Sequence, residues 1–309
     1  MSVVKFYIPD GHLEAKTLEL FEKAGFIVEI SERGYNPKID DREISLKRLR
    51  PQDFPFVLSL GKGDLAITGS DILLDFKLKE PKLGNEIVEL LDLEFGRTRL
   101  VAAISEDCFP DINSIEDFKR YSDRMKAEGK PVIVATEYFY IAKDYLRKKG
   151  IDAIIRKPAG KTEAWVIPPE PEADLIIETT ETGKTLKENR CKILDVVMET
   201  SARLIANRKS LEDPKKRRKI DEIVELFKGV LRGKCKVNVW MNVLDPKKLD
   251  SILELLEQHV ERPTISELKG GGYDIFIVID ENKIKYLLPE LKRRGASSIA
   301  ISDTRLLID

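Results

Sequence analysis

Short apolar runs alternate with longer amphipathic stretches along the first part of the chain, a pattern typical of open α/β sheets. The apolar runs predict strands at residues 5–8, 26–30, 64–68, 100–104, 132–136, 153–156 and 173–178. Apolar positions at helical spacing predict helices at 13–24, 115–126 and 141–149. The order predicts an α/β fold in which a second α/β unit begins near residue 100.

The middle of the chain has a different pattern. Residues 185–211 contain neither glycine nor proline and predict one long helix, which Asp213 and Pro214 end. Five basic residues follow at 215–219. Because acidic residues resume at once with Asp221 and Glu222, a solvated first turn of the next helix is favoured over a phosphate-binding patch.

Gly233 ends that second helix and marks a domain boundary. Beyond it the pattern predicts strands at 236–243, 264–268, 273–280 and 297–301, with helices at 246–256 and 283–294. This β-α-β-β-α-β order is that of a small ferredoxin-like module of about 75 residues. Such modules often carry regulation rather than chemistry.

Composition narrows the function classes. The 309 residues favour two or three folded units, and 53 basic against 54 acidic residues give a net charge of −1, which argues against a nucleic-acid binder. Two histidines and three cysteines, with no CxxC, HxxxH or HExxH, argue against zinc. The odd cysteine count predicts reduced thiols. No apolar run approaches a membrane span and no leader is visible, so we expect a cytoplasmic protein without membrane partners.

The most informative segment follows the apolar strand at 173–178. A polar turn rich in hydroxyl groups runs directly into a helix, and its candidate phosphate-binding residues are Thr179, Thr182, Gly183, Lys184, Thr185 and Leu186. Backbone N–H groups of a helix start attract phosphate. A Walker A loop is excluded, because Glu178 stands where its first glycine is needed. An acid followed by T-G-x-T suits a phosphorylated ribose better, since a carboxylate accepts hydrogen bonds from ribose hydroxyls. An ordinary capped helix start remains the alternative.

This segment resembles the phosphoribosyl-diphosphate loop of the ATP phosphoribosyltransferase family, whose pattern is acid-x-x-x-[ST]-G-x-T-L. Further blocks agree with the family in order and spacing at residues 50–55, 63–71, 91–96, 134–138 and 201–207. The blocks at 241–243, 262–266 and 295–299 resemble the family's C-terminal regulatory domain. The resemblance covers essentially the whole chain.

The resemblance implies a fold and a reaction. Two catalytic lobes would be built like type II periplasmic binding proteins, the first from residues 1–98 and 190–232 and the second from 99–189, with a ferredoxin-like regulatory domain at 233–309. The implied reaction joins N1 of ATP to C1 of 5-phosphoribosyl 1-diphosphate and releases diphosphate, with Mg²⁺ present. Histidine would be the feedback inhibitor. The implied assembly is a homo-oligomer, from dimer to hexamer.

The resemblance also implies residue roles. Glu178, aided by Thr179, would bind the ribose hydroxyls. The turn from Thr182 to Leu186 would bind the 5′-phosphate. The nucleotide side would contain His12, Arg33, Arg50, Thr68, Gly69 and Asp71. Glu163 and Arg50 are the candidate catalytic residues, although a surface ion pair explains Arg50 equally well. Asn242, Thr264 and Ala296 match effector positions, with core or turn roles equally open. For Asp53 we expect a helix N-cap.

One segment departs from the family. The usual P-K-G-R-L after the first strand is here Pro9-Asp10-Gly11-His12-Leu13, which removes positive charge from a loop expected to face phosphates. Lys47, Arg48 or Lys161 could compensate. The exchange leaves open a catalytically weak or inactive paralogue that acts as a ligand-binding subunit. A bilobal small-anion receptor is disfavoured, because no export signal is present.

Overall fold

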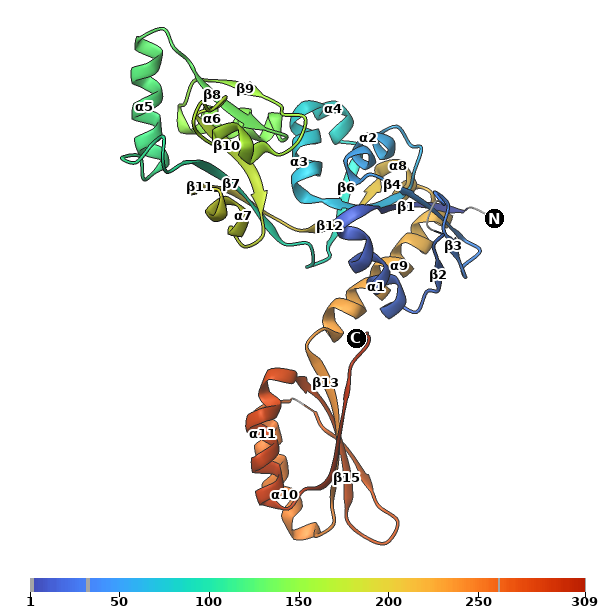
Figure 1. Ribbon diagram of the computed structural model, residues 1–309. Helices are drawn as coiled ribbons and strands as arrows, with labels where there is room; N and C mark the ends of the chain where they lie inside the picture. The colour runs from blue at the N-terminus through green and yellow to red at the C-terminus, as the bar shows by residue number, and fades with distance from the viewer. Residues whose placement is uncertain (1–2, 32–33, 261, 309) are drawn as a thin grey trace. The chain divides into compact units, whose positions relative to one another are not determined.

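The computed structural model describes residues 3–31, 34–260 and 262–308 (Figure 1). Its contacts divide the chain into two compact units. One contains the residues before Leu20 together with Phe26–Glu222, and the other contains Leu20–Gly25 together with the residues from Ile223 onward. Within the described ranges, no helix is both long and apolar enough to cross a membrane.

The first unit holds two five-stranded sheets, each the base of one lobe. The first lobe has the strand order β4-β1-β5-β12-β6, formed by β1 (Val4–Pro9), β4 (Ile44–Leu49), β5 (Leu65–Gly69), β6 (Ile87–Asp92) and β12 (Ala202–Asn207). Its helices are α1 (Glu14–Lys23), α2 (Phe54–Ser59), α3 (Ser70–Lys79), α4 (Pro81–Gly84) and α8 (Arg208–Glu212), with 3₁₀ turns η1 (Gly11–Leu13) and η2 (Pro51–Asp53). A short ribbon pairs β2 (Val28–Glu29) with β3 (Lys38–Ile39).

The core of the first lobe follows from its strand pairing. β1 runs parallel to β4 and β5, and β12 runs antiparallel to β5 and β6. All five residues of β5 are buried, as expected of a central strand covered on both faces. Phe6 of β1 and Phe54 of α2 are fully buried. Asp53 occupies the N-cap position of α2, as predicted, but its side chain makes no capping hydrogen bond there.

The second lobe has the strand order β11-β7-β10-β8-β9. Its strands are β7 (Thr98–Ser105), β8 (Val132–Thr136), β9 (Ala153–Arg156), β10 (Leu175–Thr180) and β11 (Cys191–Thr200), and its helices are α5 (Ile115–Ala127), α6 (Phe139–Lys149) and α7 (Lys184–Glu188), with the 3₁₀ turn η3 (Thr162–Val166). Ser114 caps α5, its Oγ accepting from the Asp117 N–H at 3.1 Å. Gly150 ends α6 in the left-handed conformation, as a C-terminal glycine does.

The long helix predicted at 185–211 does not exist. Only the five residues of α7 are helical in its first part, and β11 and β12 follow. The segment is rich in β-branched residues such as Ile193, Val196 and Val197, which suit strands. β11 pairs with β7, so residues 191–200 lie in the second sheet rather than in the first lobe, where the sequence analysis placed them. The chain returns to the first lobe at β12, which is inserted between β5 and β6.

The basic run at 215–219 opens α9 (Pro214–Gly233). Arg217 and Arg218 are exposed and pair with Asp221 and Glu222 one helical turn on, as a solvated turn would. Lys219 differs, because it is buried and contacts Asp41 at 2.6 Å. The expectation of a solvated turn is therefore confirmed for the two arginines and wrong for Lys219.

The C-terminal domain is a four-stranded antiparallel sheet in the order β14-β15-β13-β16. Its elements are β13 (Lys236–Val243), η4 (Pro246–Lys248), α10 (Leu249–Glu257), β14 (Thr264–Glu267), β15 (Tyr273–Asp280), α11 (Glu281–Arg294) and β16 (Ser297–Asp303). Alternate residues of β13, such as Val239 and Met241, are buried in one cluster with Leu256 and Leu291 of the two helices. Both helices cover the same face of the sheet (Figure 1). The predicted ferredoxin-like domain is confirmed.

Candidate functional site

The turn between β10 and α7 is closed by its own hydroxyl groups. The Gly183 N–H donates to Thr180 Oγ1 at 2.9 Å, and the Lys184 N–H to Thr182 Oγ1 at 3.4 Å. Gly183 has a φ of +76°, a left-handed conformation that residues with a Cβ rarely adopt. The glycine thus allows the sharp change of direction from strand to helix.

A cavity of about 390 Å³ lies beside this turn, and we call it the loop cavity. It is lined by Glu163, Glu178, Thr179, Thr180, Glu181, Thr182, Lys184, Thr185 and Leu186. Every residue that the sequence analysis assigned to the phosphoribosyl group, Gly183 excepted, therefore lines one cavity. Glu163 reaches it from η3, a separate segment of the chain.

Two charged residues of the loop cavity, Glu178 and Lys184, differ in how firmly their side chains are held. Glu178 Oε1 accepts hydrogen bonds from the Thr179 N–H at 2.8 Å and from Thr179 Oγ1 at 3.0 Å, which fixes this carboxylate. Lys184 is exposed, and within the described part of the chain its Nζ is paired with Glu188, at 3.8 Å. The lysine can therefore turn toward an anion at little cost, because an exposed ion pair contributes little.

A second cavity, of about 220 Å³, lies between the two lobes and is called the interlobe cavity. It is lined by His12, Leu13, Gln52, Gly69, Asp71, Ile72, Gly96, Thr98, Tyr138, Thr179, Thr200 and Ala202. Three predicted nucleotide-side residues, His12, Gly69 and Asp71, meet here. Thr68 does not line the cavity, because it is buried and donates to the Pro51 carbonyl at 3.0 Å. Thr179 belongs to both cavities, so they adjoin.

Tyr138 is a residue of this cavity to which the sequence analysis gave no role. Its hydroxyl donates to Asp71 of the first lobe and lies beside the Thr179 hydroxyl of the second, whose own proton goes to Glu178. Burial, together with the negative charges of Asp71 and Glu178, raises the pKa of Tyr138 well above its ordinary value. The phenol therefore stays protonated and connects the two lobes. The block at 134–138 contained this tyrosine, but no pattern in the sequence pairs it with Asp71.

A second interlobe contact lies at the start of α6. Tyr138 is the N-cap residue of α6, but its side chain makes no capping hydrogen bond. The cap comes from the first lobe, because Asp75 Oδ1 of α3 accepts from the Tyr140 N–H at 2.8 Å and the Ile141 N–H at 2.9 Å. A carboxylate at a helix N-terminus satisfies free N–H groups and the helix dipole. Burial raises the pKa of Asp75 despite these two hydrogen bonds.

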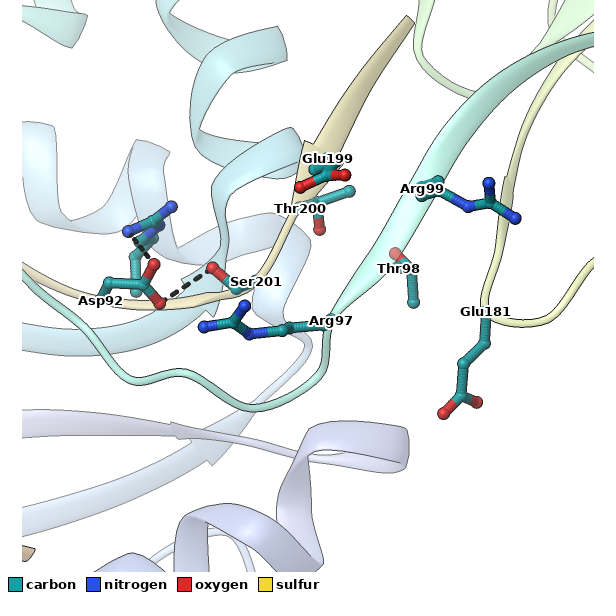
Figure 2. Close-up of a pocket in the computed structure, with 9 residues that line it drawn as sticks. Asp92, Arg97, Thr98, Arg99, Glu181, Glu199, Thr200 and Ser201 are labelled. Atoms are coloured by element: carbon teal, nitrogen blue, oxygen red, sulfur yellow. Dashed lines mark hydrogen bonds and ion pairs between the residues drawn. The ribbon is translucent and has the colours of Figure 1, made fainter. Parts of the chain in front are cut away.

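A third cavity, of about 380 Å³, lies where the chain crosses between the lobes, and we call it the crossover cavity (Figure 2). It is lined by Asp92, Arg97, Thr98, Arg99, Glu181, Glu199, Thr200, Ser201 and Arg203. Arg203 is paired with Asp92 at 2.7 Å, and the Ser201 hydroxyl donates to Asp92 at 2.9 Å. Glu181 also lines the loop cavity, and Thr98 and Thr200 also line the interlobe cavity. The three cavities therefore lie next to one another and share parts of their walls.

Comparison with known proteins identifies the family. The family model described as ATP phosphoribosyltransferase matches residues 50–229, and the model of the HisG C-terminal domain matches residues 234–305. The chain belongs to the ATP phosphoribosyltransferase family. It has the family's long form, with the C-terminal domain present, and is an enzyme of the pentosyltransferase class, as expected from the motifs.

Individual relatives agree with this assignment. A protein named ATP phosphoribosyltransferase from Archaeoglobus fulgidus is 42% identical over 255 residues, 82% of this chain and 88% of that one. One from Chlorobaculum parvum is 35% identical over 315 residues, 100% of this chain and 98% of that one. The solved ATP phosphoribosyl transferase (HisG:HisZ) complex from Thermotoga maritima has a TM-score of 0.56 at 23% identity, covering 73% of this chain and 99% of its own, which supports the fold.

The segment that departs from the family pattern contains Asp10, which forms an ion pair with Arg50. Asp10, where an ATP phosphoribosyltransferase usually has lysine, lies 3.6 Å from the Nε of Arg50. Arg50 is 73% exposed and does not line the interlobe cavity, and this ion pair is the contact that the structure shows for it. Its role toward the nucleotide stays a prediction. Arg48, a candidate for compensation, is paired with Glu14 at 2.8 Å. Arg33 lies outside the described residues.

The predicted effector residues of the C-terminal domain fall into two places. Asn242 of β13 pairs with Ser297 of β16, whose hydroxyl donates to the Asn242 carbonyl at 3.2 Å. Ala296, just before Ser297, is buried in the core cluster of this domain. Thr264 begins β14, which pairs only with β15 on the other side of β13. Within this one domain, Thr264 is therefore separated from Asn242 by a strand.

Proposed function

We propose that this enzyme transfers the phosphoribosyl group of 5-phosphoribosyl 1-diphosphate to N1 of ATP and releases diphosphate. The observation that carries the proposal is the loop cavity, in which three carboxylates, several hydroxyls and one lysine lie beside a glycine turn. Such a set matches the two ends of a ribose 5-phosphate. Carboxylates accept hydrogen bonds from ribose hydroxyls, and hydroxyls and a cation hold a phosphate.

The roles within the loop cavity follow from its contacts. Glu178, held at Oε1 by Thr179, would accept the ribose hydroxyls. Thr182, Lys184 and Thr185 would hold the 5′-phosphate. Because α7 has only five residues, its dipole adds little, and the phosphate depends on hydroxyls, backbone N–H groups and the lysine. Glu163 would complete the ribose side of the cavity.

The interlobe cavity would receive the nucleotide. It adjoins the loop cavity at Thr179, so a nucleotide bound beside Gly69, Asp71 and Tyr138 would face the ribose. Adenine N1 is unprotonated at neutral pH and needs no base to attack C1. The contribution of the protein is to position two polyanions and to stabilise the departing diphosphate.

Mg²⁺ fits this scheme as a partner of the substrates. The loop cavity contains three carboxylates, Glu163, Glu178 and Glu181, and oxygen donors of this kind suit Mg²⁺. The described residues contain no group of three or more acidic, histidine or cysteine side chains close enough to hold a metal. We therefore propose that the substrate phosphates supply most of its ligands. Bound Mg²⁺ would neutralise charge on the leaving diphosphate.

The C-terminal domain is proposed to bind histidine as an inhibitor, with Asn242 and Ala296 on one side of the site. Thr264 could contribute to that site only through a second copy of the domain, because β15 and β13 separate β14 from β16. This supports the expectation of a homo-oligomer. The oligomer size and the cytoplasmic location stay predictions.

The test is release of diphosphate by the full chain with Mg²⁺. We expect release only when ATP and phosphoribosyl diphosphate are both present, and suppression by histidine. Lys184→Gln should raise KM for phosphoribosyl diphosphate about tenfold, as expected on loss of one charge-assisted hydrogen bond. Lys187→Gln, on the same helix but outside the loop cavity, should leave KM unchanged. Absence of product with both substrates would refute the proposal.

A further inference from the structure

Arg99 lines the crossover cavity and has been given no role so far. It lies in β7, directly across from Thr180 of β10 and from Glu199 of β11. It is half-buried, and Figure 2 shows its side chain extending from β7 toward the loop that carries Glu181. The same Glu181 lines both the crossover cavity and the loop cavity.

The three arginines that line the crossover cavity, Arg97, Arg99 and Arg203, differ in whether they have a partner. Arg203 is committed to Asp92 and Glu89. Across the ranges that the structure describes, Arg97 and Arg99 form neither an ion pair nor a side-chain hydrogen bond, and no carboxylate lies within 4.0 Å of either guanidinium. Leaving a half-buried guanidinium without a partner costs free energy, because its charge loses water and gains no counterion. An anionic ligand at this place would remove that cost.

The chemistry of the reaction supplies such an anion. In the proposed function, a diphosphate leaves from C1 of a ribose that Glu178 holds, and ATP brings a triphosphate to the adjoining interlobe cavity. Guanidinium groups bind phosphate through two parallel hydrogen bonds, and such contacts gain strength where a leaving group accumulates charge. The hydroxyls of Thr98 and Thr200, shared by the crossover and interlobe cavities, add neutral donors along the path.

We propose that Arg99 binds a polyphosphate group of the substrates in the crossover cavity, either the diphosphate of phosphoribosyl diphosphate or the triphosphate of ATP. Arg97, at the other end of the cavity, supplies a second positive charge for the longer chain. The inference rests on the proposed function, and it adds a phosphate subsite on the crossover strands to the loop. The charged residues that line the crossover cavity are three arginines and three acids, so their charges sum to zero.

The test uses calorimetry on the full chain with four probes: inorganic diphosphate, inorganic triphosphate, phosphoribosyl diphosphate and ribose 5-phosphate. Arg99→Gln should weaken diphosphate binding about 10- to 100-fold, as expected for hydrogen bonds to a charged group. Ribose 5-phosphate binding should stay unchanged. Arg99→Lys keeps the charge but loses the two parallel N–H donors of the guanidinium, so its affinity for diphosphate should lie between those of the wild type and Arg99→Gln. Arg156→Gln, an equal charge change at an exposed position of the edge strand β9, serves as the matched control.

The probes separate the two sources. If phosphoribosyl diphosphate and diphosphate weaken together, Arg99 holds the leaving group; if only triphosphate and ATP weaken, it holds the nucleotide tail. Unchanged affinity for every polyphosphate in both Arg99 variants, each with the melting temperature of the wild type, would overturn the inference. The inference would also be overturned if Arg99→Gln lowered the melting temperature while Arg99→Lys bound every probe as the wild type does. A wild type that binds neither substrate would instead refute the proposed function.

Discussion

The loop cavity and the interlobe cavity adjoin at Thr179 but are built in different ways. The loop cavity comes almost entirely from one continuous segment, 178–186, and only Glu163 reaches it from elsewhere. The interlobe cavity combines short pieces of both lobes that are far apart in the chain, such as Gly69 and Tyr138. A contiguous site needs only its own turn to form, whereas the interlobe site exists only if both lobes fold and meet.

The two regions also differ in how their charge is managed. In the loop cavity, Glu178 and Lys184 are free to serve a ligand apart from local contacts with Thr179 and Glu188. At the edge of the nucleotide side, Arg50 is paired with Asp10. In the interlobe cavity, Asp71 accepts from Tyr138, a contact across the lobes. We therefore expect changes in the loop cavity to affect catalysis alone, and changes in the interlobe cavity to affect catalysis and stability together.

The largest effect is expected at Glu178. Glu178→Gln keeps the shape but replaces a charged acceptor of the ribose hydroxyls, so kcat/KM should fall about 100-fold. The melting temperature should change little, because the hydrogen bonds of this carboxylate within the described residues come from its neighbour Thr179. Steady-state kinetics with Glu172→Gln, an exposed position just before β10, as control would check this. A large loss of stability with Glu178→Gln would mean that the loop cavity is structural.

Tyr138→Phe should affect both properties. Loss of the hydroxyl leaves Asp71 and Thr179 without this contact, so KM for ATP should rise about tenfold and unfolding should become easier by about 1 kcal/mol. Tyr145→Phe is the matched control, because the Tyr145 hydroxyl donates to Asp195 at 2.8 Å outside all three cavities. The control should lose similar stability and keep KM. Equal kinetic effects of the two variants would contradict a specific role for Tyr138.

Substitution of Asp75 tests the interlobe contact separately from substrate binding, because Asp75 lines none of the three cavities. Asp75→Ala should destabilise the chain by about 1 to 2 kcal/mol, because two N–H groups of α6 lose their acceptor. Asp75→Asn, which keeps an oxygen at the same place, should change stability much less. Denaturant unfolding of both variants measures the difference.

The pH dependence of that contact has a definite sign. The folded-state pKa of Asp75 is raised above its ordinary 3.8, mainly by burial. Between those two values the native state binds more protons than the unfolded state, so the contribution of Asp75 to stability falls as pH rises through this window. Asp75→Asn should remove this part of the pH profile. A wild-type profile that rises more steeply than that of Asp75→Asn over the window would show the opposite sign.

The smallest effect is expected at the departure from the family pattern. Asp10→Asn should release the 73% exposed Arg50 from this ion pair and lower KM for ATP, by no more than about fivefold, because an ion pair with one solvated partner is weak. Asp53→Asn, an exposed acid on the same segment as Arg50, is the control. A rise in KM with Asp10→Asn would show that the acid, rather than Arg50, serves the nucleotide.

Sequence reasoning succeeded best where one element carries the information by itself. The strands β8, β9, β13 and β15 were predicted with the bounds that the structure has, because each is a short apolar or alternating run. The loop residues were found because their order alone specifies a strand, a polar turn and a helix start. The failure at 185–211 has a physical reason: absence of glycine and proline permits a long strand as well as a helix. The pairing of β11 with β7 decided between them.

The amino-acid order by itself determined the family, the ferredoxin-like domain and the composition of the phosphoribosyl turn, since each depends on neighbouring residues. Only the tertiary structure decided that Tyr138 meets Asp71, that Asp75 caps α6, and that Arg99 is left without a counterion beside the loop. These contacts join segments 65 or more positions apart. Their geometry is set by strand pairing and lobe packing, which no local pattern encodes.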